Sequence, residues 1–273
     1  MRQIERLFAT VLLVASSAVS CAGVLSIQPV RGPAVVPVAS GRARLVIPPE
    51  TVFLAREDAI RVLKRAGNST DGSEVGLVQP SGRHAYVVIG YTNGGHVPDA
   101  GALEPEPLLA ALRQAQEIQN EARCTRTRIT IDGWAAPPAY DPAARRAGWA
   151  VSARCGSDAL VHARTCLLGR TGYLSFRLVS TPADFPRDRA LVDDVLTGCA
   201  FAPGERYGDF LPDRDPVASG GLAELVTGVE PHFRDPFAPA LAGLAALCTL
   251  LVVGGPSRRR PRQAAARAPA PAR

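Results

Sequence analysis

Apolar residues at helical spacing mark two segments in the first half of the chain. Residues 56–66 (REDAIRVLKRA) repeat apolar side chains on one face, and Gly67 follows as a natural helix stop. Residues 106–123 form the longest predicted helix before the C-terminal region. Its predicted buried stripe consists of Leu108, Leu109, Leu112, Ala115 and Ile118.

Apolar and polar residues that alternate predict strands between and after these helices. The candidate strands are residues 41–47, 85–91, 128–133, 148–154, 159–167 and 172–180. Two shorter helices are predicted at residues 189–200 and 215–227, the second with Asp215 as its N-cap. Runs of strands with helices before and after them predict an α+β fold, in which helices flank a mostly antiparallel sheet.

The predicted strands and soluble helices fall within one domain, residues 41–235, which is long enough to bury its own core. The preceding residues 22–40 contain Pro, Gly and Val without a helical period. We interpret them as a linker, which is either a spacer or an edge strand.

The C-terminal region predicts a membrane anchor. Residues 236–257 carry no charge, and 22 residues of helix span roughly 33 Å, enough to cross a hydrocarbon core of about 30 Å. The following residues 258–273 contain six arginines and no acid. The positive-inside rule places this basic tail in the cytoplasm. We therefore expect one transmembrane helix in the cytoplasmic membrane and a main domain on the opposite side.

The first 21 residues agree with this orientation. Arg2 and Arg6 precede an apolar stretch that ends in small residues, which is the pattern of a secretory signal peptide. An uncleaved N-terminal anchor is the alternative. Cys21 could also be a lipidation site, although the residues before it match a lipoprotein box only loosely. Each version places the domain outside the cytoplasm, as a periplasmic domain.

Charge changes which partners we expect. The chain carries a net charge of +6, which by itself suggests nucleic acid. The basic tail contributes +6 and the first 20 residues +1, which leaves −1 for residues 21–235. A domain this close to neutral has no long-range field to attract phosphate backbones, so we expect no nucleic-acid partner.

Cysteine usage fits an oxidising compartment. Four cysteines lie in the predicted domain: Cys124, Cys155, Cys166 and Cys199. An even number in an exported domain predicts two disulfides, with three connectivities open. Four buried thiols are the alternative. The chain contains no Cys-x-x-Cys pair, so these cysteines indicate neither a zinc site nor a thioredoxin-like site.

Motifs that carry known chemistry are missing from the sequence. There is no Gly-x-Ser-x-Gly elbow, no phosphate-binding Gly-Lys-Ser/Thr loop and no His-Glu-x-x-His motif. We therefore expect no metal and no cofactor. One candidate binding site remains, a polar cleft formed by His96, Asp99, Asn120, Arg123 and Arg170.

Short motifs in a fixed order carry a family resemblance. From about residue 41 to 228 the chain resembles the bacterial membrane-anchored proteins known as domain of unknown function 2167. The motifs include Gly76-Leu77-Val78-Gln79-Pro80, Gly95-His96-Val97-Pro98-Asp99-Ala100, Gly133-Trp134, Leu168-Gly169-Arg170-Thr171-Gly172, Gly204-Glu205-Arg206-Tyr207-Gly208-Asp209-Phe210 and Asp215-Pro216-Val217-Ala218. The resemblance implies a signal sequence and a C-terminal membrane segment, but no established activity and no catalytic residue.

The chain departs from the family pattern at two places. A single Asp99 follows Pro98 where the family tends to be more acidic, which weakens a cation site there. Thr165-Cys166-Leu167 stands where a strand rich in Asn and Tyr is expected, which suggests a disulfide particular to this chain.

Two functions of different classes follow from the sequence. The first is a membrane-anchored envelope protein whose domain binds an envelope partner protein without catalysis. The alternative is an envelope enzyme, similar to a hydrolase, with an unrecognised carboxylate–histidine site. The enzyme hypothesis requires the cleft residues to meet in one pocket.

Overall fold

The computed structural model describes residues 27–228, apart from residues 67, 69, 84 and 123–127. The predicted signal peptide, transmembrane helix and basic tail therefore lie outside the described residues, and so does Cys21. Within the described residues, no helix is both long enough and apolar enough to cross a membrane.

Eight strands form the main sheet, and every neighbouring pair in it is antiparallel. In spatial order they are β1 (Val30–Arg31), β4 (Thr51–Ala55), β5 (Glu74–Pro80), β6 (Val87–Thr92), β10 (Tyr173–Ser180), β9 (Asp158–Leu168), β8 (Arg146–Cys155) and β7 (Ile129–Asp141). The central strand β10 is buried on both faces. Leu174 and Phe176 belong to one core cluster and Tyr173 to another, because successive side chains point to opposite faces.

A second layer covers one face of the main sheet. It consists of a three-stranded sheet, β11 (Cys199–Phe201), β3 (Ala43–Ile47) and β2 (Ala34–Val38), and of helix α4 (Phe185–Thr197). A short 3-10 turn, η1 (Ala39–Gly41), joins β2 to β3. Leu45 and Val195 are fully buried in the core between this layer and the sheet. The α4 side chains therefore face inward as the helical pattern predicts.

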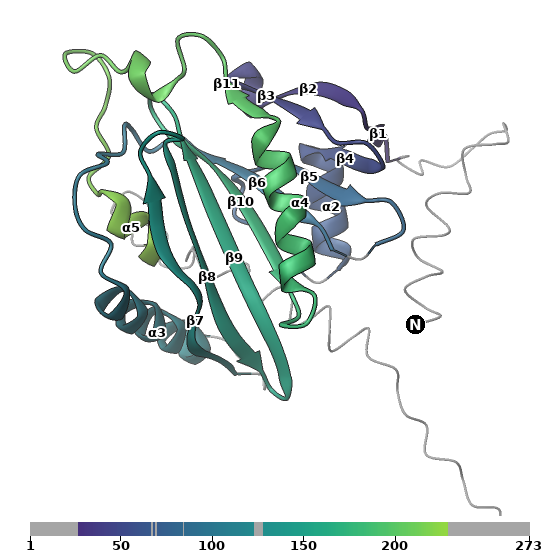
Figure 1. Ribbon diagram of the computed structural model, residues 1–273, viewed down its shortest axis with the longest axis vertical. Helices are drawn as coiled ribbons and strands as arrows, with labels where there is room; N and C mark the ends of the chain where they lie inside the picture. Colours follow the sequence, from purple (N-terminus) through teal and green to yellow (C-terminus); the bar gives the residue numbers. More distant parts are fainter. Residues whose placement is uncertain (1–26, 67, 69, 84, 123–127, 229–273) are drawn as a thin grey trace, which may run out of the picture.

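Three helices cover the other face. Helix α2 (Arg56–Arg65) packs through Ala59 and Leu63 on the strands β5 and β6. Helices α3 (Pro105–Ala122) and α5 (Leu222–Thr227) pack over the half that contains β7, β8 and β9, and Figure 1 shows α3 beside β7. The predicted α+β class with an antiparallel sheet and flanking helices is confirmed.

Helix α3 buries a different stripe from the predicted one. Ile118, expected inside, is 62% exposed, whereas Gln116 and Gln119 are buried. The buried face continues from Leu112 through Gln116 to Gln119 at steps of four and three residues, which is helical spacing. The prediction was wrong for Ile118 because it followed apolar side chains, while the helix axis sets which side faces the sheet.

Other boundaries also differ from the prediction; the helix predicted at 189–200 is α4 (Phe185–Thr197), and residues 199–200 belong to β11. Residues 34–38 form β2 at an edge of the small sheet, so the folded part of the chain begins before Gly41. The predicted helix at 215–227 is helical only over α5, and its expected N-cap Asp215 pairs with Arg170 instead. Val217, expected inside, is 55% exposed.

The cysteines do not form two disulfides. Cys166 and Cys199 are thiols rather than disulfide halves. Cys166 belongs to the core on the α3 side of the main sheet and Cys199 packs against the core on the α4 side, so the sheet separates them. Burial raises the pKa of Cys199 to about 12. Cys124 lies outside the described residues, so a disulfide that includes Cys124 is not described.

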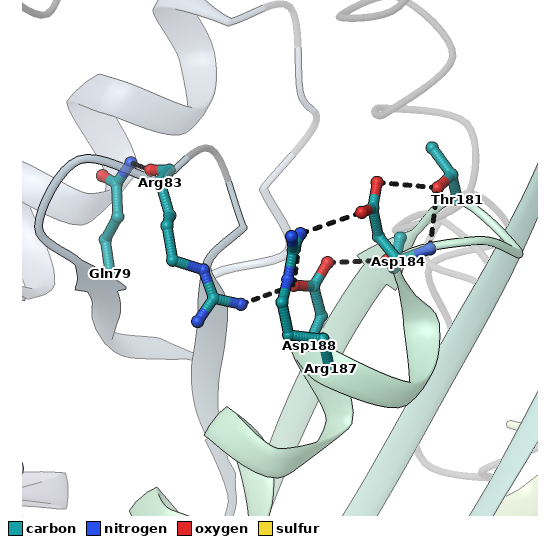
Figure 2. A network of polar contacts seen from close by, with 7 residues as sticks. Gln79, Arg83, Thr181, Asp184, Arg187 and Asp188 are labelled. Carbon is teal, nitrogen blue, oxygen red and sulfur yellow. Dashed lines mark hydrogen bonds and ion pairs between the residues drawn. The ribbon is translucent and has the colours of Figure 1, made fainter.

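A polar network joins the first turn of α4 to the main sheet (Figure 2). The buried Asp188 carboxylate accepts hydrogen bonds from the Ser180 hydroxyl on β10 and from Arg83 Nη2, both at 2.7 Å. The Arg83 carbonyl in turn accepts a hydrogen bond from Gln79 Nε2 on β5 at 2.8 Å. Asp188 thereby links the loop after β5, the end of β10 and α4.

Candidate functional site

Loops from four parts of the chain meet at one end of the main sheet. This loop end contains the segment after β6, the β7–β8 turn, the β9–β10 turn and the long segment 202–221 that runs from β11 to α5 (Figure 1). Isolated bridges tie the long segment down, between Gly169 and Arg206 and between His96 and Val217. The loop end brings together three of the five predicted cleft residues: His96, Asp99 and Arg170.

His96 is held from three sides. Its Nδ1 lies 3.0 Å from the Arg170 carbonyl oxygen. A carbonyl can only accept, so Nδ1 carries the proton and Nε2 is the acceptor in the neutral ring. The ring lies between Tyr207, with centroids 4.2 Å apart, and Phe210, at 3.9 Å and nearly parallel. His96 is therefore fixed in position and tautomer.

Asp99 is bound to an arginine and a tyrosine. Its Oδ2 accepts a hydrogen bond from the Tyr140 hydroxyl at 3.1 Å and forms an ion pair with Arg145. The Arg145 guanidinium also lies over the Tyr207 ring, 4.6 Å from its centroid. The Tyr207 hydroxyl donates to the Val97 carbonyl at 2.9 Å. This part of the loop end is thus a chain of mutually satisfied polar groups.

Arg170 and Asp215 form the second charged pair of the loop end. Arg170 Nε and Nη2 donate to the two carboxylate oxygens at 2.7 and 2.8 Å, in bidentate geometry. Arg170 Nη1 also donates to the Gly204 carbonyl at 3.1 Å. The hydrogen bonds from Arg170 lower the pKa of Asp215. The pair therefore fastens the β9–β10 turn to segment 202–221.

Asn120 lies elsewhere. Its amide donates to the Ile129 carbonyl at 2.8 Å and accepts from the Ile129 N–H at 3.1 Å. Tyr140, which contacts Asp99, lies at the other end of the same strand β7, roughly 36 Å from Ile129 along the strand at about 3.3 Å rise per residue. Asn120 joins α3 to β7 and does not share a site with His96. Arg123 lies outside the described residues.

The arrangement holds the charges of the loop end in place. His96 Nδ1 binds a carbonyl and not a carboxylate, and the Asp99 carboxylate is engaged by Arg145. In the part of the chain that the structure describes, no group of three or more His, Cys, Asp or Glu residues could hold a metal ion. The geometry supports a rigid polar platform, which consists of His96, Asp99, Arg145, Arg170, Tyr207 and Asp215.

An open groove of about 420 Å³ lies beside this platform. Its walls are the outward face of the small sheet and the beginning of segment 202–221, and its lining includes Val35, Pro37, Arg44, Ala200, Pro203 and Arg206. Arg206 directly precedes Tyr207 of the platform. The groove is a recess that is open to solvent.

Sequence reasoning missed the partners of the cleft residues. Tyr140 and Arg145 flank a hairpin turn, and Tyr207 and Asp215 lie in a segment with little regular structure. No periodic pattern marks such residues. The family motifs are the one signal in the sequence that could have found some of them. Tyr207, Phe210 and Asp215 lie in these motifs, as do the cleft residues His96, Asp99 and Arg170.

We expect a pH dependence that reports on the platform. Burial raises the pKa of Tyr207 to about 12, and the Asp99 carboxylate acts in the same direction. Burial likewise raises the pKa of Tyr86 to about 12. Unfolded tyrosines titrate near 10, so the folded chain binds these protons more tightly between about pH 10 and 12. Their stabilising contribution is complete below pH 10 and is lost as the pH rises through about 12.

The ultraviolet absorbance of tyrosinate measures this effect. We expect at least two of the five tyrosines to stay protonated near pH 11 in the folded protein. The substitution Tyr207→Phe removes one of the late-titrating groups and flattens the loss of stability between about pH 10 and 12. Simultaneous titration of all five tyrosines near pH 10 in the folded chain would contradict the expectation.

Comparisons with known proteins find one matching family model and some similar solved structures. No curated protein matches the chain. Among solved structures, it is similar to the cyanobacterial PsbP protein CyanoP from Synechocystis sp. PCC 6803, with 10% identity, a TM-score of 0.38, and coverage of 67% of this chain and 98% of that chain. It is also similar to the Ran-binding protein Mog1p of Saccharomyces cerevisiae, with 7% identity, a TM-score of 0.34, and coverage of 64% and 95%. The model of the family described as protein of unknown function (DUF2167) matches residues 30–254, so the chain belongs to this family, as the ordered motifs predict.

Proposed function

We propose that this protein is a membrane-anchored envelope protein whose extracytoplasmic domain binds a partner protein. In this proposal the domain does not catalyse a reaction. The loop end and its groove are the binding surface, and the cytoplasmic membrane is the place of action. A single-pass anchor near the C-terminus holds the domain at the outer side of this membrane.

The placement rests on the two ends of the sequence. Residues 236–257 are uncharged over a length that can span a bilayer, and the arginines that follow favour the cytoplasm. The N-terminal 21 residues have the order of a signal peptide. The near-neutral charge of residues 21–235 argues for a protein partner over nucleic acid.

The groove is the observation that carries the binding role. It is open to solvent and lies against a platform whose two acids are each paired with an arginine. Loops held by a rigid sheet are a common position for binding residues, because the sheet keeps their geometry fixed. A recess on such a scaffold suits recognition, whereas a general base needs a carboxylate or histidine that can reach a substrate proton.

One experiment tests the proposal against the enzyme alternative. The full chain is expressed with an affinity tag, a membrane-impermeant crosslinker is added to spheroplasts, and the complexes are purified in detergent. We expect a specific crosslinked partner, and no turnover above background in a panel of ester, peptide, phosphate and glycoside substrates. The crosslink requires the domain to be accessible from outside the cytoplasm.

The opposite result is equally clear. Absence of any crosslinked partner together with hydrolysis that disappears in His96→Ala would overturn the proposal in favour of an envelope hydrolase. Here His96→Ala must keep the circular dichroism spectrum of the wild type, because the ring is also packed between Tyr207 and Phe210.

A further inference from the structure

The outward face of the small sheet exposes apolar side chains to solvent. Val35 on β2 and Val46 on β3 are cross-strand partners and are 64% and 42% exposed. The next row across the sheet is Pro37, Arg44 and Ala200, one residue from each strand. Exposed large apolar residues that adjoin one another are typical of interaction sites.

The groove on this face carries unbalanced positive charge. Arg44 and Arg206 line it, and no acidic residue is among its lining residues. Neither guanidinium forms an ion pair with any of the described residues. The acids closest in sequence form other contacts than ion pairs with Arg44 or Arg206, since Glu205 pairs with Arg42 at 2.6 Å and Asp209 accepts the backbone N–H groups of Gly204 and Arg206.

We propose that the groove binds an extended segment of the partner protein in which an acidic side chain lies between apolar side chains. This inference rests on the proposed function and names the chemistry of the partner. Arg44 and Arg206 receive the carboxylate, because guanidinium and carboxylate geometry match. Val35, Pro37 and Ala200 contact the flanking apolar side chains.

The size and shape of the groove favour a peptide segment. Three neighbouring strands at about 4.8 Å spacing span about 10 Å, the length of about three extended residues. A recess of about 420 Å³ can enclose such side chains, whereas a flat membrane surface would not fill it. Pro37 lacks the N–H that an added strand would need along β2, so the segment crosses the face instead of extending the sheet.

Selection from a phage library of random heptapeptides tests the inference on the full chain in detergent. We expect the selected peptides to carry Asp or Glu between Val, Ile or Leu. The affinity of a synthetic selected peptide falls by tenfold or more in the double variant Arg44→Glu/Arg206→Glu, and it weakens with added salt. Ala200→Trp, which fills the recess without a change of charge, also lowers the affinity by about tenfold or more.

The control variant Arg65→Glu/Arg189→Glu makes the same change of charge at exposed positions on α2 and α4. Its affinity for the peptide stays within about twofold of the wild type. Selected peptides without acidic residues, or equal losses of peptide affinity in the control and groove variants, would refute the groove as the peptide-binding site. If the protein binds phosphatidylglycerol nanodiscs and only the groove variant loses this binding, the ligand of the groove is a membrane surface and the peptide proposal is wrong. If the crosslinked partner is still captured by the groove variant, the binding role stands and this site is wrong.

Discussion

The substitution Asp188→Ala should destabilise the protein by about 2–3 kcal/mol. The Asp188 side chain is 5% exposed and receives charge-assisted hydrogen bonds from Arg83 and from the Ser180 hydroxyl. Its loss leaves the buried Ser180 hydroxyl and Arg83 Nη2 without this acceptor. Arg83 is 35% exposed, so water recovers part of its solvation and limits the cost. Urea unfolding of the full chain in detergent, followed by circular dichroism, measures the change.

Two further variants separate the lost network from a general effect on α4. Asp188→Asn keeps an oxygen acceptor for Ser180 without the charge, and we expect it to cost about 1 kcal/mol less than Asp188→Ala. Asp193→Ala changes an exposed carboxylate on the same helix and should stay within about 0.5 kcal/mol of the wild type. Equal losses for Asp188→Ala and Asp193→Ala would show that the network adds nothing to stability.

The sequence predicts strands and helices well where one face is apolar and the period is clear. The strand at 172–180 is found as β10, and the helix at 56–66 as α2, each within one residue at its start or end. The strands β4 and β5 were not predicted, because Gly76 and the polar residues Glu74 and Gln79 interrupt the apolar pattern of β5. Glu74 is buried all the same, since its carboxylate accepts the Asp71 and Gly72 N–H groups.

The site was predictable only in part, for a reason that concerns distance along the chain. His96 and Arg170 are 74 residues apart and meet because β6 and β10 pair in one register. Asn120 was expected beside them because it is polar and lies at a helix exit. Its amide instead supplies both hydrogen bonds to the backbone of Ile129, which starts β7 at the far end of the sheet. One sequence contains the residue types but not the register that joins or separates them.

Register also explains why Gly172→Ala should lower the free energy of unfolding by about 2–3 kcal/mol, because the added methyl group overpacks the β9–β10 turn. A Cβ at residue 172 would lie 2.1 Å from the Thr92 carbonyl oxygen on β6, and backbone atoms cannot move aside as a flexible side chain can. The neighbouring Tyr173 pairs with Thr92 in the sheet, so the strands β6 and β10 must separate locally. Chemical unfolding of the variant measures the cost.

The same substitution should also disturb the position of His96 in the platform. Gly95 N–H donates to the Thr171 carbonyl at 3.0 Å and His96 Nδ1 to the Arg170 carbonyl, so this turn holds the His96 loop. We expect the imidazole resonances of His96 to shift or broaden in Gly172→Ala, measured by NMR. Gly133→Ala is the matched control, since a Cβ there meets nothing within 4 Å and its stability should change by less than about 0.5 kcal/mol. A Gly172→Ala variant as stable as the control, with unchanged His96 resonances, would mean that the turn yields without strain and does not position the histidine.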